Sequence, residues 1–325
     1  MSDKESGGTG LRTPHRPLMI LAGAMILLCL LSIGGLIFDD RTLVNAPIWL
    51  KPFKFTVSIG LYALTLAWLL SLVRKGRRFG WWLGTVFAIG IGTDMALLVW
   101  QMIFRGRTLH FDQATRADLD IQNIVATGAF SAWGATAVVV LLLMFQRLPD
   151  RALASALRAG TALSVAGMGV AILMFTPNAE QRAQFHGGQK PPIVGAHTVG
   201  VPDGGPGLPV LGWSTVGGDL RIPHFVGLHA LQALPILALL LVALARRYPV
   251  LGSDLVRRRL VRTAAGGYTG MLALLTWQAK RGQSIVHPDG PTLLAAAAVV
   301  VAVVVSLVLS LRVRNAVEGQ LSHVG

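Results

Sequence analysis

The sequence predicts an all-α integral membrane protein with eight transmembrane helices. Of its 325 residues, 53% are hydrophobic and only 14% are charged, and the mean hydropathy is +0.60. A soluble domain of this length needs more charge to cover its surface, so the composition indicates that lipid surrounds much of the chain. The apolar residues also fall into eight runs, each close to the roughly 20 residues that a helix needs to cross the hydrocarbon core.

The eight runs cover residues 17–38, 53–73, 80–104, 121–145, 154–175, 224–245, 260–279 and 291–312. The first run is longer than the apolar part of a signal peptide, and no clean small-residue cleavage site follows it, so a retained helix is expected. Two basic clusters, RKGRR (74–78) and RRR (257–259), fall on the same side of the membrane if the runs alternate in direction. The positive-inside rule then predicts a multi-pass protein of the cell inner (plasma) membrane with both termini cytoplasmic.

The net charge of +14 has the same explanation. The basic residues punctuate the apolar runs and form no continuous face, which argues against nucleic acid as a partner and leaves the lipid bilayer. No CxxCH, HExxH, P-loop or Rossmann pattern occurs, and the single Cys29 supplies no metal or cluster framework. The sequence therefore predicts neither a cofactor nor a metal site.

The expected organisation has two halves. It comprises a cytoplasmic tail (1–16), a first four-helix half (17–145), a fifth helix with its inner loop (146–175), an extracytoplasmic cap loop (176–223), helices six to eight (224–312) and a second cytoplasmic tail (313–325). The third run ends in Trp100-Gln101 followed by Arg105, and the seventh ends in Trp277-Gln278 followed by Arg281. This match suggests two parallel four-helix halves, as in some transporters. The spacing from Trp to Arg differs by one residue, and a chance match is the alternative.

The segment 176–223 is the longest loop that the sequence predicts. Most of it is the string GAHTVGVPDGGPGLPVLGWSTVGGDLRIPH (195–224). Its Gly and Pro content excludes a helix, yet the string is too apolar and varied for a flexible linker. Long ordered loops in compact proteins are usually lids or binding loops. We therefore expect a folded cap over the outer mouth of the bundle.

Asp94 is the leading candidate for a proton donor. It lies about 14 residues into the third run, roughly 21 Å from the cytoplasmic end at ~1.5 Å per residue. A carboxylate at this depth costs several kcal/mol unless it is paired or protonated, so it should face the bundle interior. Desolvation favours the neutral acid, which can donate a proton. The alternative is a structural hydrogen bond between helices. Gln101 and Arg105 follow on the same helical stripe.

Further acid–base candidates gather at the outer ends of the predicted helices. His110 and Asp112 are two residues apart, and Asp219 precedes the sixth run, which carries His229. Side chains of these types transfer protons in many enzymes. Together with Asp94, these residues form the predicted catalytic set. The alternatives are a solvated loop for His110 and Asp112 and a hydrogen-bonded core histidine for His229.

The predicted substrate contacts come from the same outer level of the bundle. They are Lys51, Lys54, Trp100, Gln101, Arg105, His197, Asp203, Trp213, Arg221, His224, Gln232, Trp277, Gln278 and Arg281. Lys51 and Lys54 stand at the entrance of the second run, where anion binding competes with simple snorkelling to the interface. The tryptophans are either interfacial anchors or, where they face inward, aromatic faces that stabilise a cation.

Four strings of the sequence resemble a family of bacterial polytopic membrane proteins. They are WLKPFKF (49–55), RGRTLHFD (105–112), GAHTVGVPDGGPGLPVLGWSTVGGDLRIPHFVGLHALQ (195–232) and TWQAKRGQ (276–283), and the resemblance covers nearly the whole chain. The chain is also similar to the membrane-bound terpene cyclases of actinobacterial indole-terpenoid and drimane-type pathways. This similarity implies an isomerase of secondary metabolism that acts on a prenylated substrate, and it assigns no catalytic residue.

We therefore expect an intramembrane enzyme on a prenylated or lipidic substrate, acting by protonation-initiated carbocation cyclisation. Such chemistry needs an undissociated acid, an apolar pocket, exclusion of water and aromatic faces. No DxDD or DDxxD run occurs, which argues against a soluble-type cyclase and against magnesium-dependent diphosphate ionisation. The alternatives are a transporter or channel with an outward-facing polar site and a haem- or quinone-linked redox protein. The haem version requires two histidines at one depth on facing helices.

Overall fold

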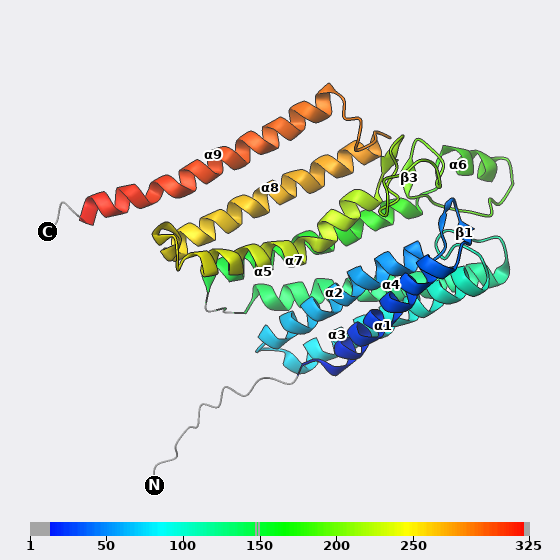
Figure 1. The fold of residues 1–325 in the computed structure, drawn as a ribbon, viewed down its shortest axis with the longest axis horizontal. Helices are drawn as coiled ribbons and strands as arrows, with labels where there is room; N and C mark the ends of the chain where they lie inside the picture. The colour runs from blue at the N-terminus through cyan, green and yellow to red at the C-terminus, as the bar shows by residue number, and fades with distance from the viewer. Residues whose placement is uncertain (1–13, 147, 149, 322–325) are drawn as a thin grey trace, which may run out of the picture.

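The computed structural model describes residues 14–321 apart from 147 and 149, with side chains as far as residue 312. Most of the predicted tails, 1–16 and 313–325, lie outside these described residues and side chains. Within the described part, long helices run side by side, and short helices, two small antiparallel strand pairs and loops join their ends (Figure 1).

The long helices carry the apolar runs of the sequence. They are α1 (Arg16–Phe38), α2 (Leu50–Leu72), α3 (Arg77–Val99), α4 (Arg116–Met144), α5 (Arg151–Val170), α7 (Arg221–Leu244), α8 (Asp254–Lys280) and α9 (Gly290–Leu321). The short elements are a π-helix η1 (Trp100–Phe104), the 3₁₀-helices η2 (Ala171–Phe175) and η3 (Pro249–Gly252), α6 (Ala179–His186), and the strands β1 (Thr42–Leu43), β2 (Ala46–Pro47), β3 (Thr198–Val199) and β4 (Gly218–Asp219).

Seven helices among the described residues are long and apolar enough to cross a membrane, which indicates an all-α, multi-pass membrane protein. Of the eight long helices described, α8 is the one outside this set; it has 27 residues. Its first turns carry Arg257, Arg258, Arg259 and Arg262, which lower its mean hydropathy. Nevertheless α8 packs against α5, α7 and α9, so it lies within the bundle.

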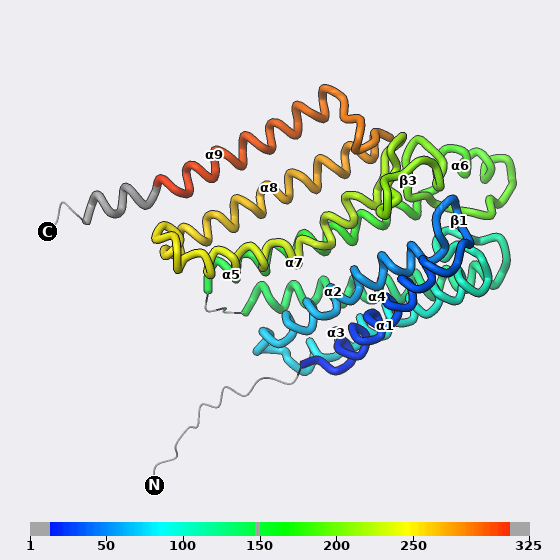
Figure 2. The backbone as a smooth tube through the Cα atoms, in the orientation of Figure 1, coloured from blue at the N-terminus to red at the C-terminus, as the bar shows by residue number. Residues whose placement is uncertain are grey.

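The bundle has two ends of different character. α1 begins and α9 leaves at one end, which also carries Arg77 on α3 and Arg257 on α8; we call it the basic end (Figure 1). Residues 39–49, 105–115, 176–220 and 281–289 gather at the opposite end, which we call the cap end (Figure 2). The apolar middle parts of the helices separate the basic end from the cap end, as the alternating direction of the apolar runs predicts.

Close backbone contacts between small residues join the helix pairs. A Cβ added at Gly167 of α5 would lie 2.5 Å from the Cα of Gly227 on α7, and one added at Gly90 of α3 would lie 2.8 Å from the carbonyl oxygen of Gly128 on α4. Membrane helices approach this closely only where neither carries a side chain, because association there depends on van der Waals packing rather than on a hydrophobic driving force.

The two matching strings of the sequence take similar conformations. Trp100 and Trp277 are 53% and 42% exposed, whereas Gln101 and Gln278, next in the chain, are buried. Both helices run from the basic end to the cap end (Figure 1). The π-helix η1 follows α3 and accommodates one residue more than a regular turn. This extra residue accounts for the one-residue difference in spacing. The duplication of a four-helix half remains a prediction.

The segment 176–223 is folded against the bundle. α6 occupies its first part, and the described residues from 195 to 220 contain no helix. The prediction that the string is free of helix as far as 224 is wrong at its end, because α7 begins at Arg221. β3 pairs with β4, and Gly218 of β4 approaches the carbonyl oxygen of Ala279 on α8 so closely that a Cβ would lie 2.0 Å from it. A hydrogen bond from Asn45 to the carbonyl of Gly204 ties the segment to the 39–49 loop. We call residues 176–220 the cap.

Substituting Gly167 by Ala should lower the melting temperature of the detergent-solubilised protein, because the new methyl group overlaps the backbone of Gly227. Gly134→Ala is the matched control, since nothing lies within 4 Å of a Cβ at that position. Ala favours a helix interior over Gly by about 1 kcal/mol, so the control should be neutral or stabilising. Equal melting temperatures for the two variants would show that α5 and α7 do not pack as described.

Candidate functional site

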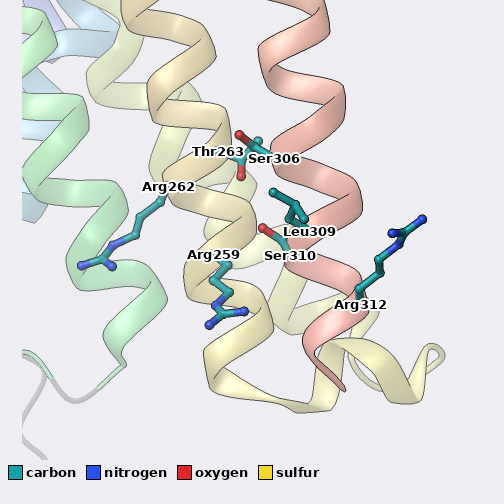
Figure 3. A pocket seen from close by; sticks show the side chains of 7 residues that line it. All are labelled: Arg259, Arg262, Thr263, Ser306, Leu309, Ser310 and Arg312. Atoms are coloured by element: carbon teal, nitrogen blue, oxygen red, sulfur yellow. The ribbon is translucent and has the colours of Figure 1, made fainter. Parts of the chain in front are cut away.

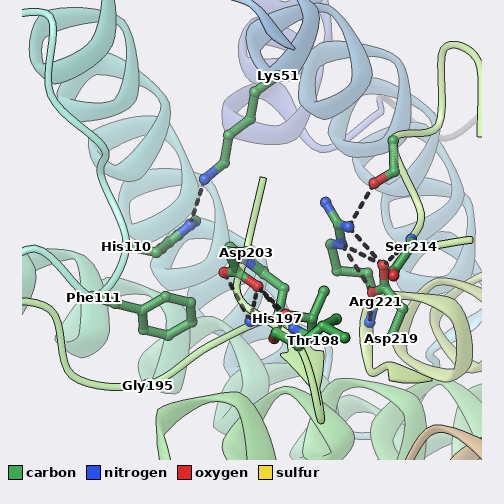
Figure 4. A network of polar contacts seen from close by, with 12 residues as sticks. Lys51, His110, Phe111, Gly195, His197, Thr198, Asp203, Ser214, Asp219 and Arg221 are labelled. Carbon is green, nitrogen blue, oxygen red and sulfur yellow. Dashed lines mark hydrogen bonds and ion pairs between the residues drawn. The ribbon is translucent and has the colours of Figure 1, made fainter. Parts of the chain in front are cut away.

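Most of the predicted polar site residues meet at the cap end. They come from the first turns of α2, from the 105–115 loop, from the cap and from the first turns of α7 (Figure 4). The central members, Lys51, His110, His197 and His224, are half-buried rather than buried. Protein surrounds them on several sides, yet each keeps some accessible surface. We call them the histidine cluster.

A carboxylate–imidazole pair from the cap forms one side of the cluster. Asp203 Oδ2 lies 2.7 Å from His197 Nδ1, and Asp203 also accepts hydrogen bonds from the amides of His197 and Thr198 and from the Thr198 hydroxyl. Gly200 and Gly204, both with left-handed backbone, turn the chain so that Asp203 returns to these amides. A carboxylate only accepts, so His197 donates from Nδ1 and its Nε2 is left as an acceptor.

Lys51 and His110 form the other side. The Lys51 ammonium lies 3.0 Å from His110 Nδ1 and 5.8 Å from the centre of the Phe55 ring. An ammonium only donates, so Nδ1 of His110 is the acceptor and its Nε2 carries the proton. The rings of His110 and His197 lie edge to face with centres 6.4 Å apart. Two imidazoles of opposite tautomer therefore face each other (Figure 4).

Phe111 fixes this arrangement from a strained backbone. Its φ is 69°, a left-handed value that is costly for an aromatic residue. Its amide donates to Gln122 of α4, and its carbonyl accepts from Val194 of the cap. The Phe111 ring lies 4.9 Å from the His197 ring. The strain thus places His110 and Phe111 against the cap.

Burial and neighbouring charges set the titration of these groups. Burial lowers the pKa of His110 well below its usual 6.5, and the charge of Lys51 lowers it further. Burial also lowers the pKa of His197, against the hydrogen bond to Asp203, which raises it. Burial alone would raise the pKa of Asp203, but its hydrogen bonds with His197 and Thr198 hold it below 3.8. At pH 7 Asp203 is therefore an anion and both imidazoles are neutral.

These shifts have a consequence for stability. His197 binds its proton less tightly in the folded chain than in the unfolded chain. The unfolded chain therefore takes up more protons as the pH falls below about 6.5. The stability that the neutral imidazole contributes is present above that pH and is lost below it. Neutral imidazole at pH 7 is also the form that a general base requires.

Asp219 and Arg221 join the cap to α7. Arg221 donates to both oxygens of Asp219 and to the carbonyl of Gly212, and the Ser214 amide donates to Asp219 Oδ2. The Asp219 side chain is fully buried. Because Arg221 and Ser214 occupy both of its oxygens, its evident role in this state is structural. Asp219 was predicted as a catalytic residue, and that prediction stays untested.

The polar side chains of α7 extend the cluster into the bundle. His224 Nδ1 lies 2.8 Å from the carbonyl of Gly167, so it donates there and leaves Nε2 as an acceptor. One turn further in, His229 Nε2 lies 3.0 Å from the Ser58 hydroxyl of α2, and its Nδ1 lies 3.3 Å from Gln232 Oε1. These contacts tie α7 to α2 and α5. Ser58 is a member of this network that the sequence analysis missed.

Trp213 and the ring of Phe225 border this part of the cluster. Their ring centres are 5.7 Å apart, and Phe225 lies 4.4 Å from the ring of His229. Trp213 is half-buried, so it is the predicted tryptophan that the structure places beside the cluster.

A second network holds the outer end of α3 to α4. Asp118 accepts from Gln101 Nε2 at 2.9 Å and from Arg105 at 2.8 Å, and Arg107 lies 3.0 Å from it. Arg107 also forms a salt bridge with Asp112 at 2.9 Å. The predicted site residues Gln101, Arg105 and Asp112 thus have internal partners. Their geometry supports a structural role.

Asp118, the centre of that network, was missed by the sequence analysis. It is 1% exposed and completes a capping box with Thr115 at the start of α4. The signal was present, because Thr-x-x-Asp before an apolar run is a helix-start pattern. A buried carboxylate with two arginines is also the usual way to hold such a charge inside a protein.

The remaining predicted residues lie apart from the cluster. Arg281 pairs with Asp289 at the corner between α8 and α9 and stacks 4.5 Å from the Trp277 ring. Gln278 donates to the carbonyl of Ser284 in the same corner. Trp100 is more than half exposed, as an interfacial anchor would be.

Asp94 lies where α3 meets α4. Its Oδ1 is buried without a hydrogen-bond partner, and it lies 2.5 Å from the position of a Cβ added to Gly128. Gly128 therefore makes room for the carboxyl group. Among the described residues, no hydrogen bond or ion pair connects Asp94 to the histidine cluster.

The cluster carries unbalanced positive charge. Arg221 is paired with Asp219 and His197 with Asp203, whereas Lys51 and Lys54 form no salt bridge with any described residue. Within the part of the chain that the structure describes, the one hydrogen bond that Lys54 donates goes to the carbonyl of Leu211. Two ammonium groups without a carboxylate attract an anionic group. No group of three or more His, Cys, Asp or Glu among the described residues is arranged to hold a metal ion.

In comparisons with known proteins, no family model, no curated protein and no solved structure matches the chain.

Asp118→Asn should destabilise the protein by about 3–5 kcal/mol, because removing one partner of a buried ion pair leaves the other charges uncompensated. Asp120→Asn is the control, since Asp120 makes an exposed pair with Arg116 at 3.5 Å, and such pairs contribute about 0–1 kcal/mol. Unfolding in a graded detergent series measures both. Similar losses for the two variants would contradict the structural role of Asp118.

Asp203→Asn should lower the pKa of His197 further, because the lost carboxylate is what opposes the effect of burial. Titration of the ¹³C-labelled imidazoles by NMR measures this change. His110 serves as the internal control, since Lys51 and burial, not Asp203, dominate its shift. A His197 pKa that stays the same or rises in the variant would show that the two side chains are not paired.

Proposed function

We propose that the protein is an intramembrane enzyme that acts on a prenylated or other lipidic substrate at the cap end of the bundle. The observation that supports this most is the Asp203–His197 pair, whose imidazole lies edge to face with that of His110, the partner of Lys51. An imidazole oriented by a carboxylate is a common general acid–base arrangement.

The surroundings of the pair favour an amphipathic substrate. Lys51 and Lys54 provide charge for an anionic or strongly polar group, and the rings of Phe55, Phe111 and Trp213 provide apolar surface nearby. A lipid whose polar group lies at the membrane surface and whose chain lies between helices would present both features. The cap would exclude water from the reacting group.

We further propose that the chain crosses the inner (plasma) membrane eight times with both termini cytoplasmic. The proposal counts α8 as a span because it lies beside α5, α7 and α9. The arginines of its first turns are near the membrane surface in that arrangement, where they can snorkel. The basic end would then be cytoplasmic by the positive-inside rule, and the cap extracytoplasmic.

For the reaction itself we propose protonation-initiated cyclisation of a prenyl chain, with Asp94 as proton donor. The resemblance to membrane-bound terpene cyclases expected from the sequence motivates this choice, and the buried Oδ1 of Asp94 without a partner is compatible with a neutral carboxylic acid. His197 would remove a proton at the end of the sequence, as a neutral base. The aromatic rings near the cluster would stabilise the cation between these steps.

The proposal predicts that His197→Gln lowers turnover of a farnesylated acceptor by about 10²–10⁴-fold, the range for loss of a general acid–base group. The assay uses membranes containing intact protein and detects cyclised product by mass spectrometry. His186→Gln, an exposed histidine at the end of α6, is the matched control and should keep full activity. Lys51→Met should raise KM more than it lowers kcat.

The Asp94→Asn variant tests the proposed cyclisation separately from the proposed binding of substrate at the histidine cluster. Loss of product in this variant with an unchanged melting temperature supports cyclisation, whereas full activity removes Asp94 from the mechanism. Failure of the wild-type protein to form any product would contradict the cyclase proposal. Movement of unchanged substrate across proteoliposomes would instead indicate a carrier, and a Soret band in the purified protein would indicate the haem-linked alternative.

A further inference from the structure

A groove between α8 and α9 lies at the basic end of the bundle, opposite the end that carries the histidine cluster. Its volume is about 510 Å³, and its lining includes Arg259 and Thr263 of α8 with Ser306, Leu309 and Ser310 of α9 (Figure 3). Arg259 and Thr263 are four residues apart, as are Ser306 and Ser310, so each pair lies along one face of its helix. The two antiparallel helices therefore place the polar pairs opposite each other.

The groove follows from where the helices touch. A Cβ at Gly267 would lie 2.6 Å from Val303, and one at Gly270 would lie 3.0 Å from Val299, so α8 and α9 are in direct contact there. Toward the basic end the glycines give way to Thr263 and Arg259, and the groove opens between the two helices at this level. The groove therefore follows from the way in which α8 and α9 pack against each other.

Polar groups in the groove lack protein partners. Many Ser and Thr side chains in this bundle donate to the carbonyl one turn back, as Thr269 does to Ala265. In contrast, Thr263, Ser306 and Ser310 form no hydrogen bond within the described part of the chain, although Ser310 is only 7% exposed. Arg259 likewise forms no salt bridge there.

The position of the groove favours a lipid. Only 6% of the most apolar part of α9 is buried, so this helix exposes its side chains to the surroundings. Val301, Val304 and Val305 are more than half exposed and continue from the groove toward the middle of the helix. In Figure 3, Arg259 lies along α8 and points toward the basic end, whereas Arg262 points away from α9 and Arg312 points away from α8. Cation, hydroxyls and an apolar strip thus follow one another in the order of a phospholipid.

We propose that this groove binds an anionic glycerophospholipid of the leaflet at the basic end. The phosphate receives hydrogen bonds from Arg259 and the hydroxyls of Ser310 and Thr263, and the acyl chains lie along the exposed valines of α9. Basic pockets between membrane helices recognise such headgroups. The site is independent of the proposed enzymatic function.

The test measures lipid retention by native mass spectrometry of the full-length protein with phosphatidylglycerol or phosphatidylcholine of identical acyl chains. Wild-type protein should retain phosphatidylglycerol preferentially. Arg259→Gln should reduce that preference by about fivefold and leave phosphatidylcholine retention nearly unchanged. Ser310→Ala keeps the charge but removes a donor to the phosphate that both lipids carry, so it should reduce retention of both lipids.

The control is Arg77→Gln/Arg78→Gln, which removes exposed charges from the same end of the bundle but from α3. It should retain the wild-type preference. An equal loss in this control would show a general surface charge effect and overturn the site, as would unchanged retention in both test variants. Displacement of phosphatidylglycerol by millimolar inorganic phosphate alone would show that the groove takes a free anion and not a lipid.

Discussion

The carboxylate of Asp203 is the group on which the cap end depends. It accepts hydrogen bonds from two backbone amides, a hydroxyl and an imidazole, all within residues 197–198. A Gly- and Pro-rich segment has no helix or extended sheet to define its course, so side-chain hydrogen bonds must do so. The same bonds fix the tautomer and the direction of His197. Cap folding and the proposed chemistry therefore depend on one side chain.

The membrane imposes a second constraint, because a polar group in hydrocarbon must be satisfied within the protein. Most of the polar residues at the cap end meet this demand through partners, as Asp118 does with Arg105 and Asp219 does with Arg221. Within the described part of the chain, some atoms have no hydrogen-bond partner, such as Nε2 of His197 and of His224 at the cap end and Oδ1 of Asp94 between α3 and α4. These unsatisfied groups, rather than the polar residues as a whole, are where binding or proton transfer is to be sought.

Hydropathy predicted the helices well because the length of an apolar run follows directly from bilayer thickness. It predicted their starts less well. α4 begins at Arg116 and α8 at Asp254, several residues before the apolar runs at 121 and 260. Their first turns are polar, so hydropathy marks where a helix enters the hydrocarbon rather than where it begins.

The sequence predicted which residues belong to the candidate site, but it did not predict which of them contact each other. Lys51 and His110 were predicted from their position near outer helix ends, and His197 and Asp203 as substrate contacts in the cap loop. The contact between Lys51 and His110 joins residues 59 positions apart and depends on how α2 and the strained 110–111 turn meet the cap. No local pattern encodes such a contact. Conversely, the depth of Asp94 was evident from the sequence, whereas its contact with Gly128 required the packing of α3 on α4.

The central claim is that two neutral imidazoles of opposite tautomer face each other beside Lys51. Long-range ¹H–¹⁵N NMR of the protein in nanodiscs at pH 7 tests it directly, since the two ring nitrogens of each tautomer have distinct shifts. The account predicts a proton on Nδ1 of His197 and on Nε2 of His110, with the His197 Nε2 signal moving when a farnesylated acceptor is added. Protonated or freely exchanging rings that do not respond to the acceptor would contradict it.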